Sequence, residues 1–129
     1  HTTASLIILE LTPTQEGGLP LDASAREETL KVVANHCLNT VREVDVVSRF
    51  NGEQFIILCP QTELDAAKIL ADRLLACLTG HYQLSENFSV AIGMSELKES
   101  EEFPEWMERT IKALYQSKRQ GFGTVSIAH

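Results

Sequence analysis

The sequence contains few cysteines, and they form no recognisable pattern. Cys37, Cys59 and Cys77 are odd in number, lack a Cys-x-x-Cys spacing and fall on apolar periodic positions or at strand ends. Such positions are typical of buried, reduced thiols. His36 and His81 also lack a partner at the spacing of a metal site. We therefore expect neither a disulfide framework nor a cysteine- or histidine-based metal centre.

Long hydrophobic runs are missing as well. No apolar stretch approaches the roughly 20 residues that a membrane-spanning helix needs, and the chain does not start with the charged and then apolar segment of a secretory signal. The sequence therefore predicts a cytoplasmic domain that makes no membrane contact. Its 129 residues suit a single domain, 1–129, and a chain that starts directly on a strand is expected to derive from a longer, multidomain protein.

Basic residues are in deficit. The chain has 11 Lys and Arg against 18 Asp and Glu, which gives a formal net charge of −7. Binding to nucleic acid or to an anionic membrane without specificity requires a basic surface that releases counterions. These two partner classes are therefore excluded, and a phosphate-bearing ligand would have to be held by a few local arginines.

The hydrophobic periodicity predicts the element order β-α-β-β-α-β-α-β. The hairpin turn is expected at Asn51-Gly52, a strong short signal for such turns, and Thr62 is expected to cap the second helix. This order predicts an α+β sandwich, with helices on one face of a largely antiparallel sheet and the hairpin at its centre. The expected strands cover 5–11, 45–50, 54–59, 88–94 and 124–128, and the expected helices cover 24–41, 62–78 and 104–120.

Residues 42–55 carry the most specific motif, Arg-Glu-Val-Asp-Val-Val-Ser-Arg-Phe followed by Asn51, Gly52, Glu53, Gln54 and Phe55. This segment resembles the signature of the diguanylate cyclase (GGDEF) family, in which an Arg-x-x-Asp motif precedes an Arg-aromatic pair and Gly-Gly-(Asp/Glu)-Glu-Phe. The similarity continues in the same order through 60–62, 71–74, 88–93 and 112–121. The resemblance implies a palm-like fold, related to nucleotidyl cyclases and ferredoxin-like domains. For an active member it also implies condensation of two GTP into cyclic di-GMP by a head-to-tail pair of domains.

Two acidic residues are candidates for a metal site. Phosphoryl transfer depends on charge neutralisation, and Mg²⁺ or Mn²⁺ takes oxygen ligands. Glu10, at the end of the first strand, and Glu53, after the hairpin turn, could supply them, and both align with the metal-binding acids of the family. Lys118 aligns with a phosphate-contacting lysine. The alternative is that Glu10 is an ordinary strand-end carboxylate and Glu53 an ordinary residue after a turn.

Several departures from the family pattern indicate that catalysis has been lost. Asn51 replaces the first signature glycine and adds a side chain where backbone approaches phosphate. Gln54 replaces a glutamate and can neither take a proton nor contribute charge. Phe122 replaces an arginine, Glu27 is the only counterpart of a guanine-binding aspartate, and the segment 10–18 keeps almost none of the motif that usually follows the first strand. We therefore expect a degenerate active site, with no cofactor required and Mg²⁺ or Mn²⁺ bound only together with GTP.

A second site is better preserved. The resemblance implies an inhibitory site for cyclic di-GMP that consists of the Arg-x-x-Asp motif and an arginine on the following helix, and Arg42, Asp45 and Arg73 match all three positions. Guanidinium groups pair with phosphate and stack on purines, and a carboxylate accepts guanine N–H donors. The alternative is a local Arg42–Asp45 surface pair beside a solvated Arg73.

Three functions follow as hypotheses. The first is a cyclic di-GMP-binding regulatory module without catalytic activity, and the second is a weakly active diguanylate cyclase. The third is a GTP-binding or dimerisation platform for a fused domain. In each case the expected partners are fused sensory or phosphodiesterase domains and, in a homodimer, a second copy of the chain.

Overall fold

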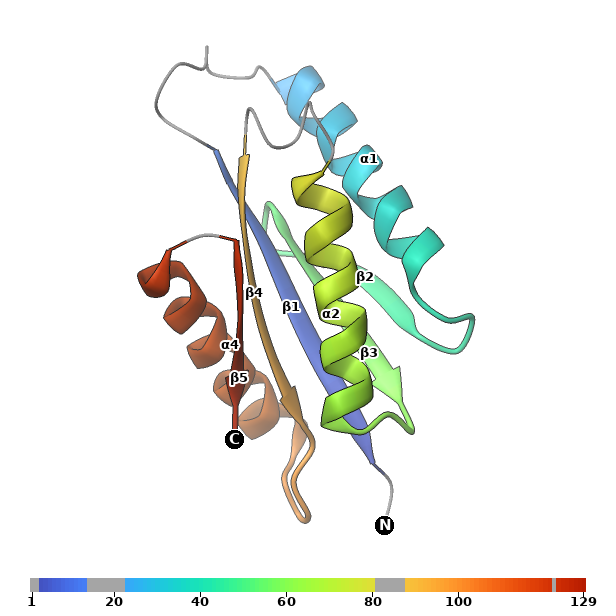
Figure 1. The fold of residues 1–129 in the computed structure, drawn as a ribbon, viewed down its shortest axis with the longest axis vertical. Helices are drawn as coiled ribbons and strands as arrows, with labels where there is room; N and C mark the ends of the chain where they lie inside the picture. Colours follow the sequence, from blue (N-terminus) through green and yellow to red (C-terminus); the bar gives the residue numbers. More distant parts are fainter. Residues whose placement is uncertain (1–2, 14–22, 81–87, 122) are drawn as a thin grey trace.

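The computed structural model describes residues 3–13, 23–80, 88–121 and 123–129 (Figure 1). Within them the predicted order of strands and helices is confirmed. The strands are β1 (Ala4–Pro13), β2 (Val46–Phe50), β3 (Gln54–Pro60), β4 (Phe88–Glu96) and β5 (Thr124–Ala128), and the helices are α1 (Ala23–Thr40), α2 (Leu64–Thr79) and α4 (Phe103–Gln120). None of the helices in the described part of the chain is long and apolar enough to cross a membrane.

The sheet has the strand order β2-β3-β1-β4-β5. Neighbouring strands are antiparallel except β4 and β5, which are parallel. The predicted hairpin is present as β2 and β3, but its expected place at the centre of the sheet is wrong, because β2 is an edge strand. The central strand is β1, whose residues from Leu6 to Leu9 are all completely buried. A continuous apolar run of this kind is stable only where strands and helices cover it on every side.

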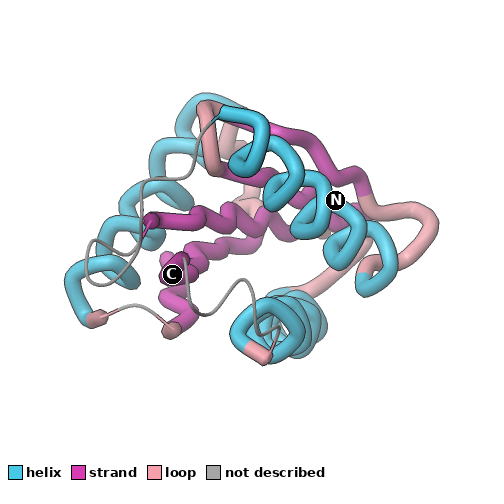
Figure 2. Tube along the Cα trace, turned by 90° about the horizontal axis from the view of Figure 1, so that it is seen from above, coloured by secondary structure: helices cyan, strands magenta, loops and turns pink. Residues whose placement is uncertain are grey.

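Helices cover both faces of the sheet, so the expectation of helices on one face is wrong. The main core lies between the sheet and the pair α1 and α2 and includes Ile7, Leu9 and Phe55. Ile8, whose side chain points to the opposite face of β1, packs with Leu114 of α4. Figure 2 looks down the molecule and shows helices on both sides of the layer of strands.

The close packing of α4 on β4 depends on a glycine. A Cβ atom at Gly93 would lie 2.3 Å from the backbone nitrogen of Leu114. Only a residue without a side chain lets the helix backbone approach the strand this closely. The contact fixes α4 over the edge of the sheet, and with it Lys118 in the last turn of the helix.

The start of α2 differs from the prediction. The residue before the helix is Glu63, which makes no side-chain capping bond, so Thr62 is not the cap. Instead, the backbone N–H of Leu64 donates to Oε1 of Glu96, at the end of β4, over 3.2 Å. A carboxylate from a distant strand therefore satisfies a free N–H at this helix end, and Thr62 is left to take part in a different network.

Candidate functional site

The Arg-x-x-Asp motif forms a closed turn between α1 and β2. The backbone N–H of Asp45 donates to the carbonyl of Arg42 over 3.0 Å, and the backbone N–H of Arg42 donates to Oδ2 of Asp45 over 2.9 Å. The guanidinium also reaches the carboxylate, with Nη2 3.1 Å from Oδ1 and Nε 3.4 Å from Oδ2. The Asp45 side chain is completely covered, whereas 55% of the Arg42 side chain is exposed. The carboxylate therefore acts as a buried anchor for an exposed cation.

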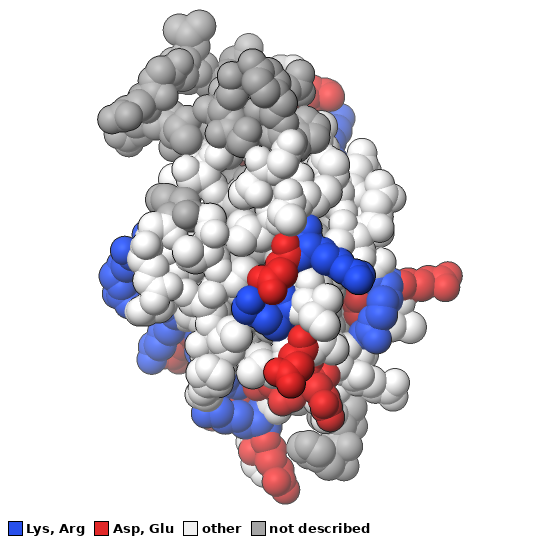
Figure 3. Space-filling model, in the orientation of Figure 1, with Lys and Arg blue, Asp and Glu red and all other residues white. Residues whose placement is uncertain are grey.

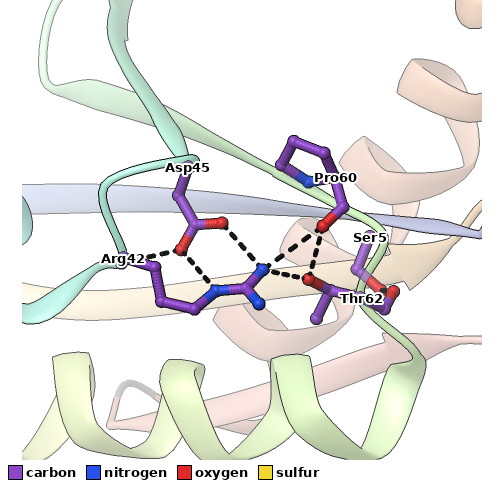
Figure 4. A network of polar contacts seen from close by, with 5 residues as sticks. All are labelled: Ser5, Arg42, Asp45, Pro60 and Thr62. Carbon is purple, nitrogen blue, oxygen red and sulfur yellow. Dashed lines mark hydrogen bonds and ion pairs between the residues drawn. The ribbon is translucent and has the colours of Figure 1, made fainter.

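Two further groups hold the Arg42 guanidinium in place. Nη2 donates to the carbonyl of Pro60 over 3.3 Å and to the hydroxyl of Thr62 (Figure 4). Thr62 is fixed in turn, because its hydroxyl bonds to the Pro60 carbonyl and its own carbonyl accepts a buried hydrogen bond from Ser5. Among the described residues, none accepts a hydrogen bond from Nη1 of Arg42. Sequence reasoning missed these partners, because the network joins positions far apart along the chain.

The electrostatics of the turn favour the charged form of Arg42. The hydrogen bond and the charge of Asp45 raise the pKa of Arg42 above its ordinary value. Burial raises the pKa of the neighbouring Cys59 thiol to about 12, and the Asp45 carboxylate adds to this effect. Cys59 is therefore a neutral, buried neighbour of the Arg42–Asp45 pair.

Arg73, the third predicted residue, lies exposed on α2. Its neighbour Asp72 is already paired, since Nζ of Lys68 lies 2.8 and 2.9 Å from the two carboxylate oxygens. Within the described ranges, no hydrogen bond or ion pair engages Arg73. Figure 3 shows basic and acidic side chains intermixed on this face rather than a continuous basic patch. The structure thus brings Arg42 and Asp45 into contact and places Arg73 apart from them, exposed on the helix that follows.

The signature hairpin forms a second candidate site. Residues 51–53 make the turn, with Gly52 at φ 62° and a hydrogen bond from the backbone N–H of Gln54 to the carbonyl of Asn51 over 3.2 Å. Phe55 points to the other side and is completely buried in the main core. The last residue of the signature is therefore a packing residue, and the polar ones surround the turn.

Glu10 lies opposite Gln54 in the pairing of β1 with β3. Nε2 of Gln54 donates to Oε1 of Glu10 over 2.5 Å, the Thr12 hydroxyl lies 3.4 Å from Oε2, and Lys118 of α4 forms an ion pair with Oε2. Burial alone would raise the pKa of Glu10, but the hydrogen bonds from Lys118 and Gln54 and the lysine charge lower it below its usual value. Glu10 is therefore a carboxylate whose charge is already neutralised by a lysine.

The other signature carboxylate is also paired. Oε1 of Glu53 lies 3.5 Å from Nε of Arg26 on α1. Glu27, the counterpart of a guanine-binding aspartate, forms an ion pair with Arg49 over 3.0 Å, and Arg49 also donates to the carbonyl of Gly52 over 3.1 Å. Two charged residues of α1 thus fasten the hairpin, and sequence reasoning missed both contacts because no local pattern links α1 to the turn.

The described residues do not form a ready metal site. The structure brings the backbones of Glu10 and Glu53 together, since the N–H of Leu11 donates to the carbonyl of Glu53 over 3.1 Å. Yet each carboxylate is paired with its own cation, and no group of three metal-ligating side chains occurs among the described residues. Mg²⁺ held by one or two carboxylates usually needs phosphate oxygens as well. Phe122 and most of the segment 10–18 lie outside the described residues.

Comparison with known proteins gives one family. The family model described as "Diguanylate cyclase, GGDEF domain" matches residues 23–124. The chain is 31% identical over 109 residues to the diguanylate cyclase DgcP of Pseudomonas aeruginosa, and 32% identical over 107 residues to the diguanylate cyclase DgcM of Escherichia coli. Both matches cover 81% of this chain but only 16% and 26% of the relatives, so the chain spans a small part of their length.

Solved structures agree with the fold. The active GGEEF domain of a diguanylate cyclase from Vibrio cholerae aligns with a TM-score of 0.86 at 22% identity, covering 98% of this chain and 83% of that one. The GGDEF domain of DgcB from Caulobacter crescentus, in complex with c-di-GMP, aligns with a TM-score of 0.76 at 22% identity, covering 98% and 78%. At this identity the likeness establishes the fold, and the function has to be argued from the residues.

Proposed function

Because the chain belongs to the diguanylate cyclase GGDEF-domain family, we propose that it is a catalytically inactive member that binds cyclic di-GMP through Arg42, Asp45 and Arg73. The observation that carries the proposal is the state of Arg42, whose guanidinium is fixed by a buried carboxylate while more than half of its side chain stays exposed. A preorganised arginine loses little conformational entropy when it binds an anion.

Each member of the site has a distinct role. The Arg42 side chain is 55% exposed, and its guanidinium suits a phosphate, to which it donates, or a guanine ring, on which it stacks. Asp45 is covered and accepts three hydrogen bonds from Arg42, so in this arrangement it is a positioning residue. Arg73 supplies a second cation, to which no ion pair is formed by the residues that the structure describes, and this suits a ligand with two phosphates.

The side-chain contacts around the signature hairpin support the proposed loss of cyclase activity. Gln54 donates to Glu10 at a position where the family has an acid, and Lys118 and Arg26 neutralise the two acids that a metal would need. Catalysis of phosphoryl transfer depends on charged groups placed around the triphosphate. In this chain Glu10, Glu53 and Lys118 are instead engaged in ion pairs within the protein. The regulatory role, the homodimer and the fused sensory or phosphodiesterase domains belong to the same proposal.

Titration calorimetry tests the proposal. We expect cyclic di-GMP to bind with low micromolar affinity, and Arg42→Ala to weaken binding roughly tenfold to a hundredfold. Arg119→Ala removes an exposed arginine elsewhere and should leave the affinity unchanged, which makes it the matched control for charge. Absence of binding, or binding that survives Arg42→Ala and Arg73→Ala but fails in Glu53→Ala, would contradict the proposal.

Weak cyclase activity is the second candidate, because Glu10, Glu53 and Lys118 are all retained and lie around one hairpin. A GTP-binding or dimerisation platform is the third. Titration with GTP and Mg²⁺ distinguishes the two from the main proposal. Binding of GTP with turnover supports the cyclase, and binding of GTP without turnover and without cyclic di-GMP binding supports the platform.

A further inference from the structure

The three cysteines differ in their surroundings. The expectation of buried thiols holds for Cys37 and Cys59, which are completely buried, and is wrong for Cys77, which is partly exposed on α2. Burial, together with the nearby Cys77 thiol, raises the pKa of Cys37 to about 12. Thiols of this kind stay protonated and react slowly, because only the thiolate is a nucleophile. Cys77 is therefore the one cysteine with access to solvent.

Cys77 also has a basic partner. Its Sγ lies 3.1 Å from Nδ1 of His36, which belongs to α1, the helix packed beside α2 (Figure 1). With its proton on Nε2, the imidazole accepts the S–H hydrogen bond at Nδ1 and is placed to take the thiol proton when the sulfur reacts. The pairing was invisible in the sequence because 41 residues separate the two side chains.

We propose that Cys77 is an oxidation site, activated by His36, that reacts with small hydroperoxides. As His36 takes the thiol proton, the sulfur attacks the distal oxygen of the hydroperoxide, so that an S–O bond forms as the O–O bond breaks. The sulfur is oxidised by two electrons to a sulfenic acid and the peroxide is reduced to an alcohol, or to water from hydrogen peroxide. The proton that His36 accepted goes to the leaving oxygen. A thiol can then reduce the sulfenic acid through a mixed disulfide, with release of water.

The position of Cys77 on α2 places the modification beside the proposed cyclic di-GMP site. Arg73 lies four residues earlier, which is one helical turn, so the two residues share a face of α2. A thiol adduct on Cys77 would add bulk beside a member of the proposed cyclic di-GMP site. This extension rests on the proposed function, whereas the oxidation itself does not.

The test is site-resolved labelling of the folded domain. Reduced protein is treated with hydrogen peroxide in the presence of dimedone, which traps sulfenic acids, and the adducts are mapped by mass spectrometry. We expect label on Cys77 and none on Cys37 or Cys59. His36→Gln should slow labelling of Cys77 roughly tenfold, because the base that takes the thiol proton is lost. In urea, where all three thiols are exposed, the differences should vanish.

A matched control separates activation from mere exposure. Ile69 is 57% exposed on the same helix, so Ile69→Cys combined with Cys77→Ser gives an exposed thiol without the histidine. We expect this thiol to react more slowly than Cys77 and to be insensitive to His36→Gln. The proposal is overturned if it reacts as fast as Cys77, if His36→Gln folds normally and leaves Cys77 unchanged, or if the buried thiols label equally. Failure of cyclic di-GMP to bind at all would remove the proposed function but leave these labelling results standing.

Discussion

Nε2 of Gln54 donates to Oε1 of Glu10 over 2.5 Å, across the antiparallel pair of β1 and β3. A glutamate at position 54 would place two carboxylates opposite each other, an arrangement that an enzyme can relieve with a metal ion and that is otherwise unfavourable. The amide removes this repulsion and donates a hydrogen bond as well. The hairpin therefore gains a cross-strand hydrogen bond at a position where two glutamates would repel each other.

The first prediction concerns turnover. The domain incubated with GTP and Mg²⁺ or Mn²⁺ should produce no more cyclic di-GMP than its Glu53→Ala variant, because Glu10 and Glu53 are neutralised within the protein. Product is measured by chromatography against a standard. Metal-dependent product above the Glu53→Ala level would contradict the prediction.

The second prediction concerns stability and pH. The folded pKa of Glu10 lies below the ordinary value of 4.5, so the folded state favours the ionised form. Its contribution to the free energy of unfolding is therefore fully present above about pH 4.5 and is lost as pH falls through the folded pKa. Wild type should exceed Glu10→Gln in stability at pH 7, and the difference should shrink below pH 4.5. Urea unfolding at a series of pH values measures it.

The same ion pair can be tested from its lysine, with Lys118→Gln as the variant and Lys112→Gln as its matched control. Lys112 is an exposed lysine of α4 that pairs with Glu108 at the helix surface, whereas Lys118 pairs with the partly buried Glu10. Surface pairs contribute little, so Lys112→Gln should hardly change the stability while Lys118→Gln lowers it. Equal effects of the two variants, or a stability difference for Glu10→Gln that grows as pH falls, would show that the carboxylate is not held in its ionised form.

The sequence predicted the order of the elements because each is encoded locally, by hydrophobic period or by a turn such as Asn51-Gly52. It did not predict the edge position of the hairpin, because the order of strands depends on which apolar run can be buried on all sides. The sequence also did not predict which residues pair with the charged side chains. Arg109 donates to Glu101 over 2.7 Å and to the carbonyls of Glu96 and Ala128, and no periodicity links these positions.

In the candidate site, too, local features could be predicted from the sequence and tertiary contacts could not. Arg42 and Asp45 were predictable because both belong to one turn of four residues. The sequence pattern predicted Thr62 as a helix cap, a common role for threonine before a helix. In the structure its hydroxyl instead accepts a hydrogen bond from the distant Arg42. A propensity describes only neighbours in the chain, and the tertiary structure can override it at any polar residue.

The third prediction tests the packing of α4. Gly93→Ala should lower the free energy of unfolding by about 3 kcal/mol, because the new Cβ would overlap the backbone at Leu114 and neither backbone can move freely. Gly52→Ala is the control, since nothing lies within 4 Å of a Cβ there and the cost is the left-handed backbone alone, about 1 kcal/mol. Chemical denaturation compares the two, and an equal loss would show that α4 does not pack as described.

The last prediction separates positioning from contact at Asp45. Asp45→Asn keeps a carbonyl oxygen that can accept from Arg42 but loses the charge and part of the hydrogen bonding, so cyclic di-GMP affinity should fall by roughly threefold to tenfold, less than for Arg42→Ala. If Asp45 acts only by holding Arg42, the double variant Arg42→Ala and Asp45→Asn should bind no more weakly than Arg42→Ala alone, because the second change has nothing left to position. Calorimetry on the four proteins completes the cycle. Additive losses would mean that the carboxylate contacts the ligand itself, which would require Arg42 to leave the arrangement described here, and the role assigned to Asp45 would then be wrong.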